Sequence, residues 1–244
     1  MSDLNGKTAL ITGASRGIGA AVARMLHARG CNLGLASRSG SDLGLERVVA
    51  RPCDVRDLDA LVELCAATAE RFGGIDIVVP NAGVGAYGPF LDLSRDHLDE
   101  MLDVNLKGTV YVIRAALPHM LGREGDVVTL ASEAGRRGLP YEAVYCASKF
   151  GQVGLTRALD HELREQGIRC TNVCPGGVAT DFALEEGRGR TPDALPGMMN
   201  AEDVAEVVLF VLTRPRKRTW DGGRRDERPV LASRQLEDDL GDVA

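Results

Sequence analysis

The segment Thr12-Gly-Ala-Ser-Arg-Gly-Ile-Gly19 constrains the fold most strongly, because glycines permit tight turns and close approaches of the backbone. It follows a short apolar run, Thr8 to Thr12, and it opens a segment with helical spacing of apolar residues, Gly17 to Arg29. This order predicts a strand, a turn and a helix whose first N–H groups can face a phosphate. A glycine-rich turn alone is also compatible with a plain loop, so its position after a strand is what makes it informative.

Strand-like and helix-like segments alternate along the rest of the chain. The predicted strands are Cys31–Ser37, Val48–Cys53, Ile75–Val79, Asp126–Ala131 and Ile168–Val173, and the predicted helices are Leu58–Arg71, Ser94–Leu121, Glu142–Glu165 and Ala201–Thr213. This alternation predicts an α/β fold, a single-domain doubly wound parallel sheet (Rossmann fold) with helices on both faces. The linker from Arg38 to Arg47 is barely long enough for a parallel crossover, so we expect a stunted helix or a bare loop there.

We expect residues 1–213 to form this Rossmann-type domain, with a flap at 182–200 that is rich in Gly, Pro, Arg and Glu. Residues 214–244 form a charged C-terminal extension, in which 228–233 can supply one more strand and the acidic end is compatible with disorder.

Composition excludes several function classes. The net charge of -6 argues against binding to the nucleic-acid backbone. The six cysteines form no C-x-x-C pair and the four histidines are scattered, so we expect no metal site. The N-terminus lacks a signal-peptide pattern and no apolar run has membrane length, which predicts a reduced, cytoplasmic protein with no membrane partner.

Residues at the ends of the predicted strands favour a nucleotide. These ends meet at one edge of the sheet, where ligands bind in this fold class. They carry Ser37-Arg38, Asp54-Val55, Asn81-Ala82-Gly83, Ser132 and Pro175-Gly176. NAD-binding chains usually place an acidic residue at the end of the second strand, whereas this chain places Arg38 there and Arg16 in the glycine turn. Two guanidinium groups favour NADP(H) over NAD(H), although either is also compatible with an ordinary solvated charge.

A second group of residues indicates proton-transfer chemistry. Tyr145 and Lys149 are four residues apart in a predicted helix, hence on one face, and the cation lowers the pKa of the phenol toward a useful range. Ser132 can hydrogen-bond a substrate oxygen or simply cap a helix. Asn105 interrupts a helical stretch, which indicates either a local kink or an anchor for a proton-relay water.

Together these motifs resemble the classical short-chain dehydrogenase/reductase family, from about Lys7 to Thr213. The resemblance rests on Thr12-Gly13-x3-Gly17-Ile18-Gly19, Asn81-Ala82-Gly83, Asn105, Ser132, Tyr145-x3-Lys149 and Pro175-Gly176. It implies that Tyr145 is the general acid/base, that Lys149 holds the nicotinamide ribose and that Ser132 orients the substrate carbonyl. It also implies that Asn105 supports the water relay. The cofactor-binding residues that it implies are Gly13, Ser15, Arg16, Gly17, Ile18, Gly19, Arg38, Asp54, Val55, Asn81, Ala82, Gly83, Tyr145, Lys149, Pro175, Gly176, Val178 and Thr180.

The predicted function is that of an NADP(H)-dependent oxidoreductase that interconverts a ketone or aldehyde and an alcohol, on a small-molecule substrate. By the resemblance it is a homotetramer or homodimer, although Arg214 onward replaces the family's C-terminal glycine-rich strand signature, which puts one interface in doubt. Pro80 also stands where the family usually has asparagine. The alternative is a catalytically silent NADP(H)-binding sensor or scaffold. Six residues flank the predicted reaction centre, namely Gly85, Tyr87, Phe90, Leu139, Tyr141 and Phe182. Each can be either a wall of the substrate pocket or an ordinary core or loop residue.

Overall fold

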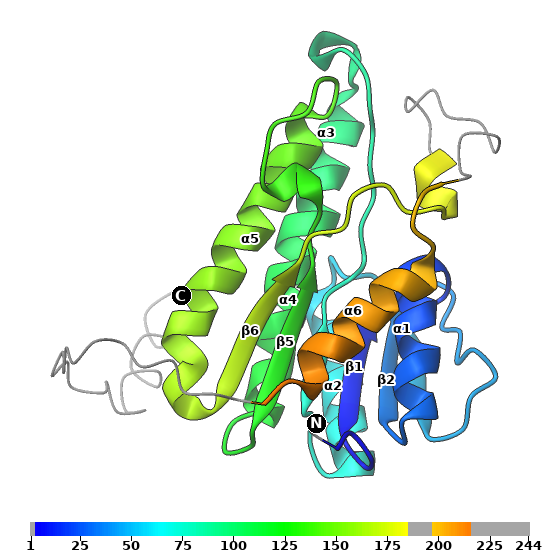
Figure 1. Cartoon of the computed structure of the whole chain (residues 1–244), viewed down its shortest axis with the longest axis vertical. Helices are drawn as coiled ribbons and strands as arrows, with labels where there is room; N and C mark the ends of the chain where they lie inside the picture. The colour runs from blue at the N-terminus through cyan, green and yellow to red at the C-terminus, as the bar shows by residue number, and fades with distance from the viewer. Residues whose placement is uncertain (1–2, 185–196, 216–244) are drawn as a thin grey trace, which may run out of the picture. The chain divides into compact units, whose positions relative to one another are not determined.

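The computed structural model describes residues 3–184 and 197–215, and its centre is a six-stranded sheet (Figure 1). The strands are β1 (Thr8–Thr12), β2 (Asn32–Ser37), β3 (Val48–Pro52), β4 (Ile77–Val79), β5 (Gly125–Leu130) and β6 (Ile168–Val173). Neighbouring strands are parallel and lie in the order β3-β2-β1-β4-β5-β6. The predicted doubly wound Rossmann fold is therefore confirmed. The strand order changes direction between β1 and β4, which is where ligands bind in this fold class.

Helices cover both faces of the sheet (Figure 1). The helices on one face are α1 (Gly17–Ala28) and α6 (Ala201–Thr213), and those on the other are α2 (Leu58–Phe72), α4 (Gly108–Ala116) and α5 (Ala143–Leu163). Side chains alternate along β1, so Ile11 packs in the cluster with α1 and α6, whereas Leu10 packs in the cluster with α2 and α4. Because both faces are covered, the strands are continuous apolar runs.

The long helix predicted at 94–121 is divided in the structure. Its parts are α3 (Arg95–Met101), a π-helical turn (Leu102–Lys107), α4 and a short 3₁₀ turn (Leu117–His119). The carbonyl of Asn105, inside the π-helical turn, accepts hydrogen bonds from Thr109 Oγ1 and Gln152 Nε2, each at 2.7 Å. A side chain that inserts into a helical hydrogen-bond ladder in this way locally widens the helix. The other 3₁₀ turns are Phe90–Asp92, Glu133–Gly135, Arg164–Gln166 and Asp181–Leu184.

The linker between β2 and β3 contains turns and no helix, one of the two outcomes that its length predicted. Four residues in it have positive φ, namely Gly40, Leu43, Gly44 and Arg47. Glycine adopts this conformation readily, whereas Leu43 at 59° and Arg47 at 54° pay a steric penalty. The short crossover therefore folds as a sequence of tight turns.

Other predicted segments fall mainly outside the described residues. The structure describes only 182–184 and 197–200 of the flap predicted at 182–200, and the strand predicted at 228–233 lies outside it. Within the described ranges, no helix combines the length and apolarity needed to cross a membrane. The cytoplasmic location stays a prediction.

A buried carboxylate joins the amino ends of β1 and β4, at the edge opposite the ligand-binding edge. Asp76 has 3% of its side chain exposed and accepts hydrogen bonds from the N–H of Thr8 at 2.9 Å and from Lys7 Nζ at 3.1 Å. Arg123 Nη2 also lies 3.1 Å from Asp76 Oδ1. A buried charge without such partners costs several kcal/mol, so these contacts allow the carboxylate to be buried.

The cysteines are packed as apolar side chains. Five are buried and Cys174 is partly exposed, and none forms a disulfide. Burial raises the thiol pKa of Cys31 and Cys53 to about 11 and that of Cys65 and Cys170 to about 12, because a thiolate is disfavoured away from water. These four thiols therefore remain protonated at neutral pH.

Candidate active site

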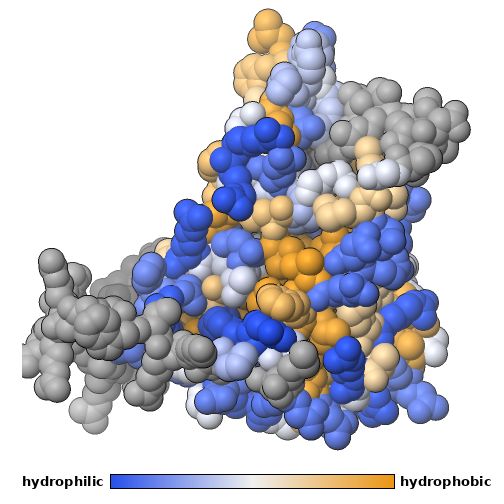
Figure 2. Space-filling model, viewed as in Figure 1, coloured by the Kyte–Doolittle hydropathy of each residue, from blue (hydrophilic) through white to orange (hydrophobic). Residues whose placement is uncertain are grey.

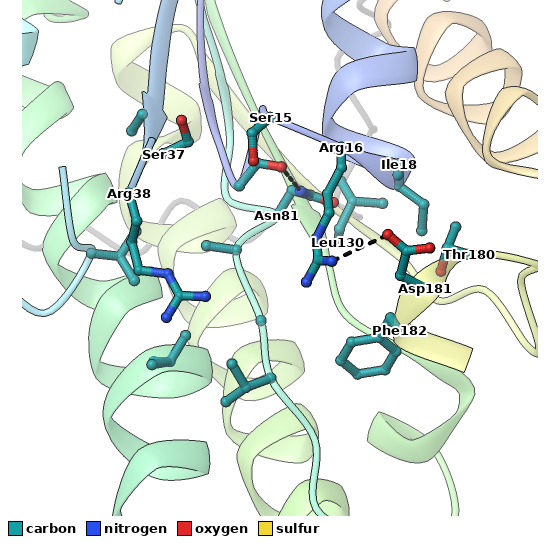
Figure 3. Close-up of a pocket in the computed structure, with 18 of the residues that line it drawn as sticks. Ser15, Arg16, Ile18, Ser37, Arg38, Asn81, Leu130, Thr180, Asp181 and Phe182 are labelled. Atoms are coloured by element: carbon teal, nitrogen blue, oxygen red, sulfur yellow. Dashed lines mark hydrogen bonds and ion pairs between the residues drawn. The ribbon is translucent and has the colours of Figure 1, made fainter. Parts of the chain in front are cut away.

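A cavity of about 390 Å³ lies at the carboxyl ends of the strands, over the point where the strand order reverses (Figure 3). Its walls include residues from the glycine turn and from every strand end that the sequence singled out. The predicted residues that line it are Gly13, Ser15, Arg16, Gly17, Ile18, Arg38, Asp54, Val55, Asn81, Ala82, Gly83, Ser132, Tyr145, Lys149, Pro175, Gly176, Val178 and Thr180. Gly19 and Asn105 lie behind this wall.

The glycine turn is held close to the end of β4. Gly13 has a φ of +63°, and a Cβ there would lie 2.9 Å from Ala82 Cα. A Cβ on Gly19 would collide with the carbonyl of Gly13. Gly19 therefore allows the start of α1 to pack tightly against the turn.

Thr12 and Asn81 fasten β1 to β4 at the floor of the cavity. The hydroxyl of Thr12 accepts hydrogen bonds from the N–H of Asn81 at 3.0 Å and from the N–H of Ala82 at 3.1 Å. Asn81 Nδ2 donates to the carbonyl of Thr12 at 2.9 Å and also to that of Gly13. Asn81 thus fixes the shape of the glycine turn from behind.

Replacing Thr12 by valine is expected to lower the free energy of unfolding by about 2 kcal/mol, because the N–H groups of Asn81 and Ala82 lose their acceptor. Urea denaturation measures this loss. Thr8→Val is the matched control, since Thr8 is buried on the same strand and its hydroxyl has no hydrogen-bond partner among the described residues. Equal losses in the two variants would contradict the role given to Thr12.

The first turn of α1 can accept an anion. No described side chain caps this helix and its first turn contains no acidic residue, so the N–H groups of Gly17 and Ile18 remain without helical acceptors. The positive end of the helix dipole adds to their attraction for negative charge. Because Gly17 and Ile18 line the cavity, this end of the site fits a phosphate group.

Two arginines line the cavity, Arg38 beside Ser37 at the end of β2 and Arg16 beside Asp181 (Figure 3). Arg38 is exposed and forms no ion pair with any described residue, whereas Arg16 Nη1 lies 3.1 Å from Asp181 Oδ2. Asp54 is held by Arg56, whose hydrogen bonds keep the pKa of the Asp54 carboxyl below its usual range. Among the described residues, Arg38 is therefore the cation beside the second strand that has no ion pair, although it acts electrostatically on Asp54, while Arg16 is paired with Asp181.

The opposite end of the cavity holds the predicted proton-transfer group. Tyr145 and Lys149 are one turn apart on α5, are 5% and 4% exposed, and Lys149 Nζ lies 5.6 Å from the Tyr145 ring centroid. Burial lowers the pKa of Lys149 to about 8. Ser132 also lines this end, and its hydroxyl accepts a hydrogen bond from the N–H of Ala134 at 3.1 Å. It therefore caps the following turn and also faces the cavity.

Asn105 is fully buried and its side chain is engaged. Its Nδ2 donates to the carbonyl of Val84 at 2.9 Å and to Ser148 Oγ at 3.1 Å, and its Oδ1 accepts from the N–H of Val84 at 2.8 Å. Asn105 thus fixes the segment that follows β4 against α5. Its part in a water relay stays a prediction.

Sequence reasoning missed Gln152, which contacts both Lys149 and Asn105. The available signal was its spacing, since Gln152 lies three residues after Lys149 and seven after Tyr145, on the same face of the helix. A polar residue on the buried face of a helix needs a partner, and the nearest ionisable side chain was Lys149.

Aromatic rings surround Tyr145 on the substrate side. The ring centroids of Tyr87 and Phe182 lie 5.7 and 5.9 Å from that of Tyr145. Phe182 also lines the cavity, whereas Phe90 and Tyr141 are exposed and do not. Of the six residues that the sequence placed around the reaction centre, Phe182 is thus the one that lines the cavity. Within 3–184 and 197–215, no cluster of His, Cys, Asp and Glu has the arrangement of a metal site.

A doubly wound parallel sheet that brings a glycine turn and a tyrosine–lysine pair into one cavity defines a Rossmann-type oxidoreductase. Known proteins bear this out. The model of the short chain dehydrogenase family matches residues 7–190, so the chain belongs to this family. It is 41% identical over 203 residues to oxidoreductase UcpA of Salmonella typhimurium (strain LT2), covering 79% of this chain and 77% of that protein. It is 34% identical over 224 residues to an uncharacterized oxidoreductase of Staphylococcus aureus (strain USA300), covering 88% and 95%.

Solved structures agree with the fold. Carveol dehydrogenase from Mycobacterium avium, in complex with NAD, superposes with a TM-score of 0.78 at 29% identity, covering 86% of this chain and 92% of that one. A short chain dehydrogenase from Burkholderia cenocepacia J2315, in complex with NADP, gives a TM-score of 0.77 at 33% identity, with the same two coverages of 86% and 92%.

Proposed function

We propose that this protein is an NADP(H)-dependent oxidoreductase that interconverts a ketone or aldehyde and an alcohol. The observation that carries this proposal is the single cavity that has Arg38 at one end and Ser132, Tyr145 and Lys149 at the other. The first end suits a phosphorylated nucleotide and the second suits proton transfer to an oxygen.

The residues present fit the proposed cofactor. The uncapped first turn of α1 supplies N–H donors for a diphosphate, and Gly13 leaves the turn without a side chain. The second strand ends in Ser37 and Arg38 rather than in a carboxylate, which favours a 2′-phosphate over a bare ribose hydroxyl. The two structural relatives are described with NAD in one and NADP in the other, so the preference for NADP(H) rests on Arg38.

Each residue at the chemical end has a distinct task in this proposal. The nicotinamide cofactor, when bound, supplies or accepts the hydride. Tyr145 donates a proton to the carbonyl oxygen during reduction and removes the hydroxyl proton during oxidation. Lys149 supplies a cation that favours the phenolate form of Tyr145 and offers an N–H to the nicotinamide ribose. Ser132 donates a hydrogen bond that orients the substrate oxygen, and the ring of Phe182 supports an apolar substrate body.

Exposed apolar side chains support self-association. Val110 on α4 and Phe150 on α5 are 39% and 46% exposed. On the face drawn in Figure 2, apolar colour also extends over α6, where Val207 and Phe210 are about half exposed. Apolar surface of this kind is typical of interfaces between copies of a chain. We therefore include a homodimer or homotetramer in the proposal.

Titration of the purified protein with NADPH and with NADH tests the proposed function, followed by NADPH oxidation with a panel of ketones, diketones and aldehydes. We expect tighter binding of NADPH than of NADH and turnover of at least one carbonyl compound. Binding of neither cofactor would contradict the whole proposal. Binding of NADPH without turnover of any panel compound would favour the sensor or scaffold alternative.

A further inference from the structure

A buried glutamine lies between Lys149 and the π-helical turn. Gln152 is 1% exposed and follows Lys149 by one turn of α5. Its Oε1 accepts a hydrogen bond from Lys149 Nζ at 3.0 Å. Its Nε2 donates to the carbonyl of Asn105 and to Thr109 Oγ1, each at 2.7 Å. Both ends of this side-chain amide are therefore engaged.

The orientation of this amide is fixed by its partners. An ammonium group only donates hydrogen bonds and a backbone carbonyl only accepts them. The oxygen of Gln152 must therefore face Lys149, and its nitrogen must face Asn105. The amide dipole thus presents its negative end to the cation, in a buried environment where such an interaction is strong.

The remaining contacts of Lys149 show what Gln152 contributes. Lys149 Nζ also donates to the carbonyl of Leu130 at 3.2 Å, so two of its three N–H groups have acceptors in the protein. No described residue accepts a third hydrogen bond from Lys149 Nζ, so this N–H is available to the cavity that Lys149 lines. Because burial lowers the pKa of Lys149 to about 8, a fixed acceptor has a large influence on whether the amine is charged near neutral pH.

Other ionisable groups near Lys149 are few in the described part of the chain. Tyr145 precedes it on α5, and Cys174 follows β6 and acts on it electrostatically. The charged groups on the turns packed against α5 are already paired, Glu133 with Arg137 and Asp103 with Lys107. Asp126, on β5, is paired with Arg169. No described carboxylate forms an ion pair with Lys149, so its acceptors are the neutral oxygens of Leu130 and Gln152.

We propose that Gln152 is a positioning residue, which holds the Lys149 ammonium beside Tyr145 and connects it directly to the carbonyl of Asn105. This inference rests on the proposed function, in which Tyr145 transfers the proton. In this proposal the side-chain amide of Gln152 links Lys149 to Asn105. The family resemblance implies a water relay at that place. Both hydrogen bonds of the Asn105 carbonyl, to Thr109 and Gln152, are consistent with this assignment.

The Gln152→Met variant tests the proposal, because methionine keeps the length of the side chain and removes its acceptor and its donors. The ionisation of Tyr145 is measured by ultraviolet titration, as the difference between each protein and the same protein carrying Tyr145→Phe. We expect the pKa of Tyr145 to be about one unit higher in Gln152→Met, because the Lys149 ammonium is then no longer fixed beside the ring and stabilises the phenolate less. The pH at which kcat rises is expected to shift upward as well.

Thr156→Val is the matched control. Thr156 is buried on the same helix; its hydroxyl donates to the carbonyl of Gln152 and accepts from Thr129 Oγ1, so its loss removes buried hydrogen bonds without touching Lys149. We expect Thr156→Val to lower the free energy of unfolding and to leave the pKa of Tyr145 unchanged. If the pKa of Tyr145 is unchanged in Gln152→Met as well, the proposal is overturned and Gln152 contributes only to packing.

A second variant covers the case in which Gln152→Met does not fold. Gln152→Glu has nearly the same shape and places a carboxylate beside the Lys149 ammonium, so its negative charge offsets the positive charge that Tyr145 experiences and is expected to raise the pKa of Tyr145 too. No shift in Gln152→Glu would likewise overturn the proposal. Neither titration needs a substrate or a cofactor. A protein that binds no NADPH would refute the proposed function, while the two titrations would still decide the position of Lys149.

Discussion

Replacing Tyr145 by phenylalanine is expected to lower kcat by about 10³-fold and to leave the dissociation constant of NADPH nearly unchanged. Phenylalanine keeps the ring that packs against Tyr87 and Phe182 and removes only the hydroxyl that exchanges the proton. Steady-state kinetics with a carbonyl compound found active in the panel, together with NADPH titration, measures both quantities.

The control for this variant is Tyr111→Phe, on α4. Tyr111 packs near Lys107 and does not line the cavity, so the loss of its hydroxyl is expected to leave kcat within about twofold. Retained turnover in Tyr145→Phe would remove the acid/base role from Tyr145. A joint loss of turnover and of NADPH binding would instead assign Tyr145 mainly to the binding of the cofactor.

Replacing Arg38 by aspartate is expected to reduce the preference for NADPH over NADH by about 100-fold, expressed as the ratio of the two dissociation constants. The change removes a cation from the end of the second strand and introduces a carboxylate. That carboxylate repels a 2′-phosphate and accepts a hydrogen bond from a ribose hydroxyl. Fluorescence titration with each cofactor measures the ratio.

Arg51→Asp makes the same change of charge outside the cavity. Arg51 is about half exposed on β3, next to Glu63, and does not line the cavity. We expect both dissociation constants to stay close to those of the parent protein. A similar loss of affinity for both cofactors in Arg38→Asp would refute the phosphate-binding role of Arg38.

Much of the fold follows from local pattern. Strand ends and helix faces are set by short-range periodicity, and in a parallel sheet all carboxyl ends lie on one edge. For that reason Arg38, Asn81 and Ser132, far apart in the sequence, are predicted to share a site, and the structure places them around one cavity. Within 94–121 the sequence indicated an interruption at Asn105, but the π-helical form of that interruption was harder to predict, because one donor to the Asn105 carbonyl, Gln152, lies on another helix.

Side-chain pairing explains most of what sequence reasoning missed. Arg16 and Asp181 are 165 residues apart, and their contact depends on how the glycine turn and the segment after β6 meet in space. Asp54 lines the cavity, and its carboxylate is also held by Arg56, two residues along the chain, a pairing that the sequence pattern does not show. Such contacts depend on rotamers and on long-range packing, which periodicity does not specify.

The burial of the cysteines has a consequence for how the protein tolerates oxidants. Peroxides and alkylating reagents attack thiolates, and Cys31, Cys53, Cys65 and Cys170 are both shielded and protonated at neutral pH. Cys174 is the partly exposed thiol, next to the Pro175 that lines the cavity. A maleimide dye is therefore expected to label this protein mainly at Cys174, without any engineered cysteine.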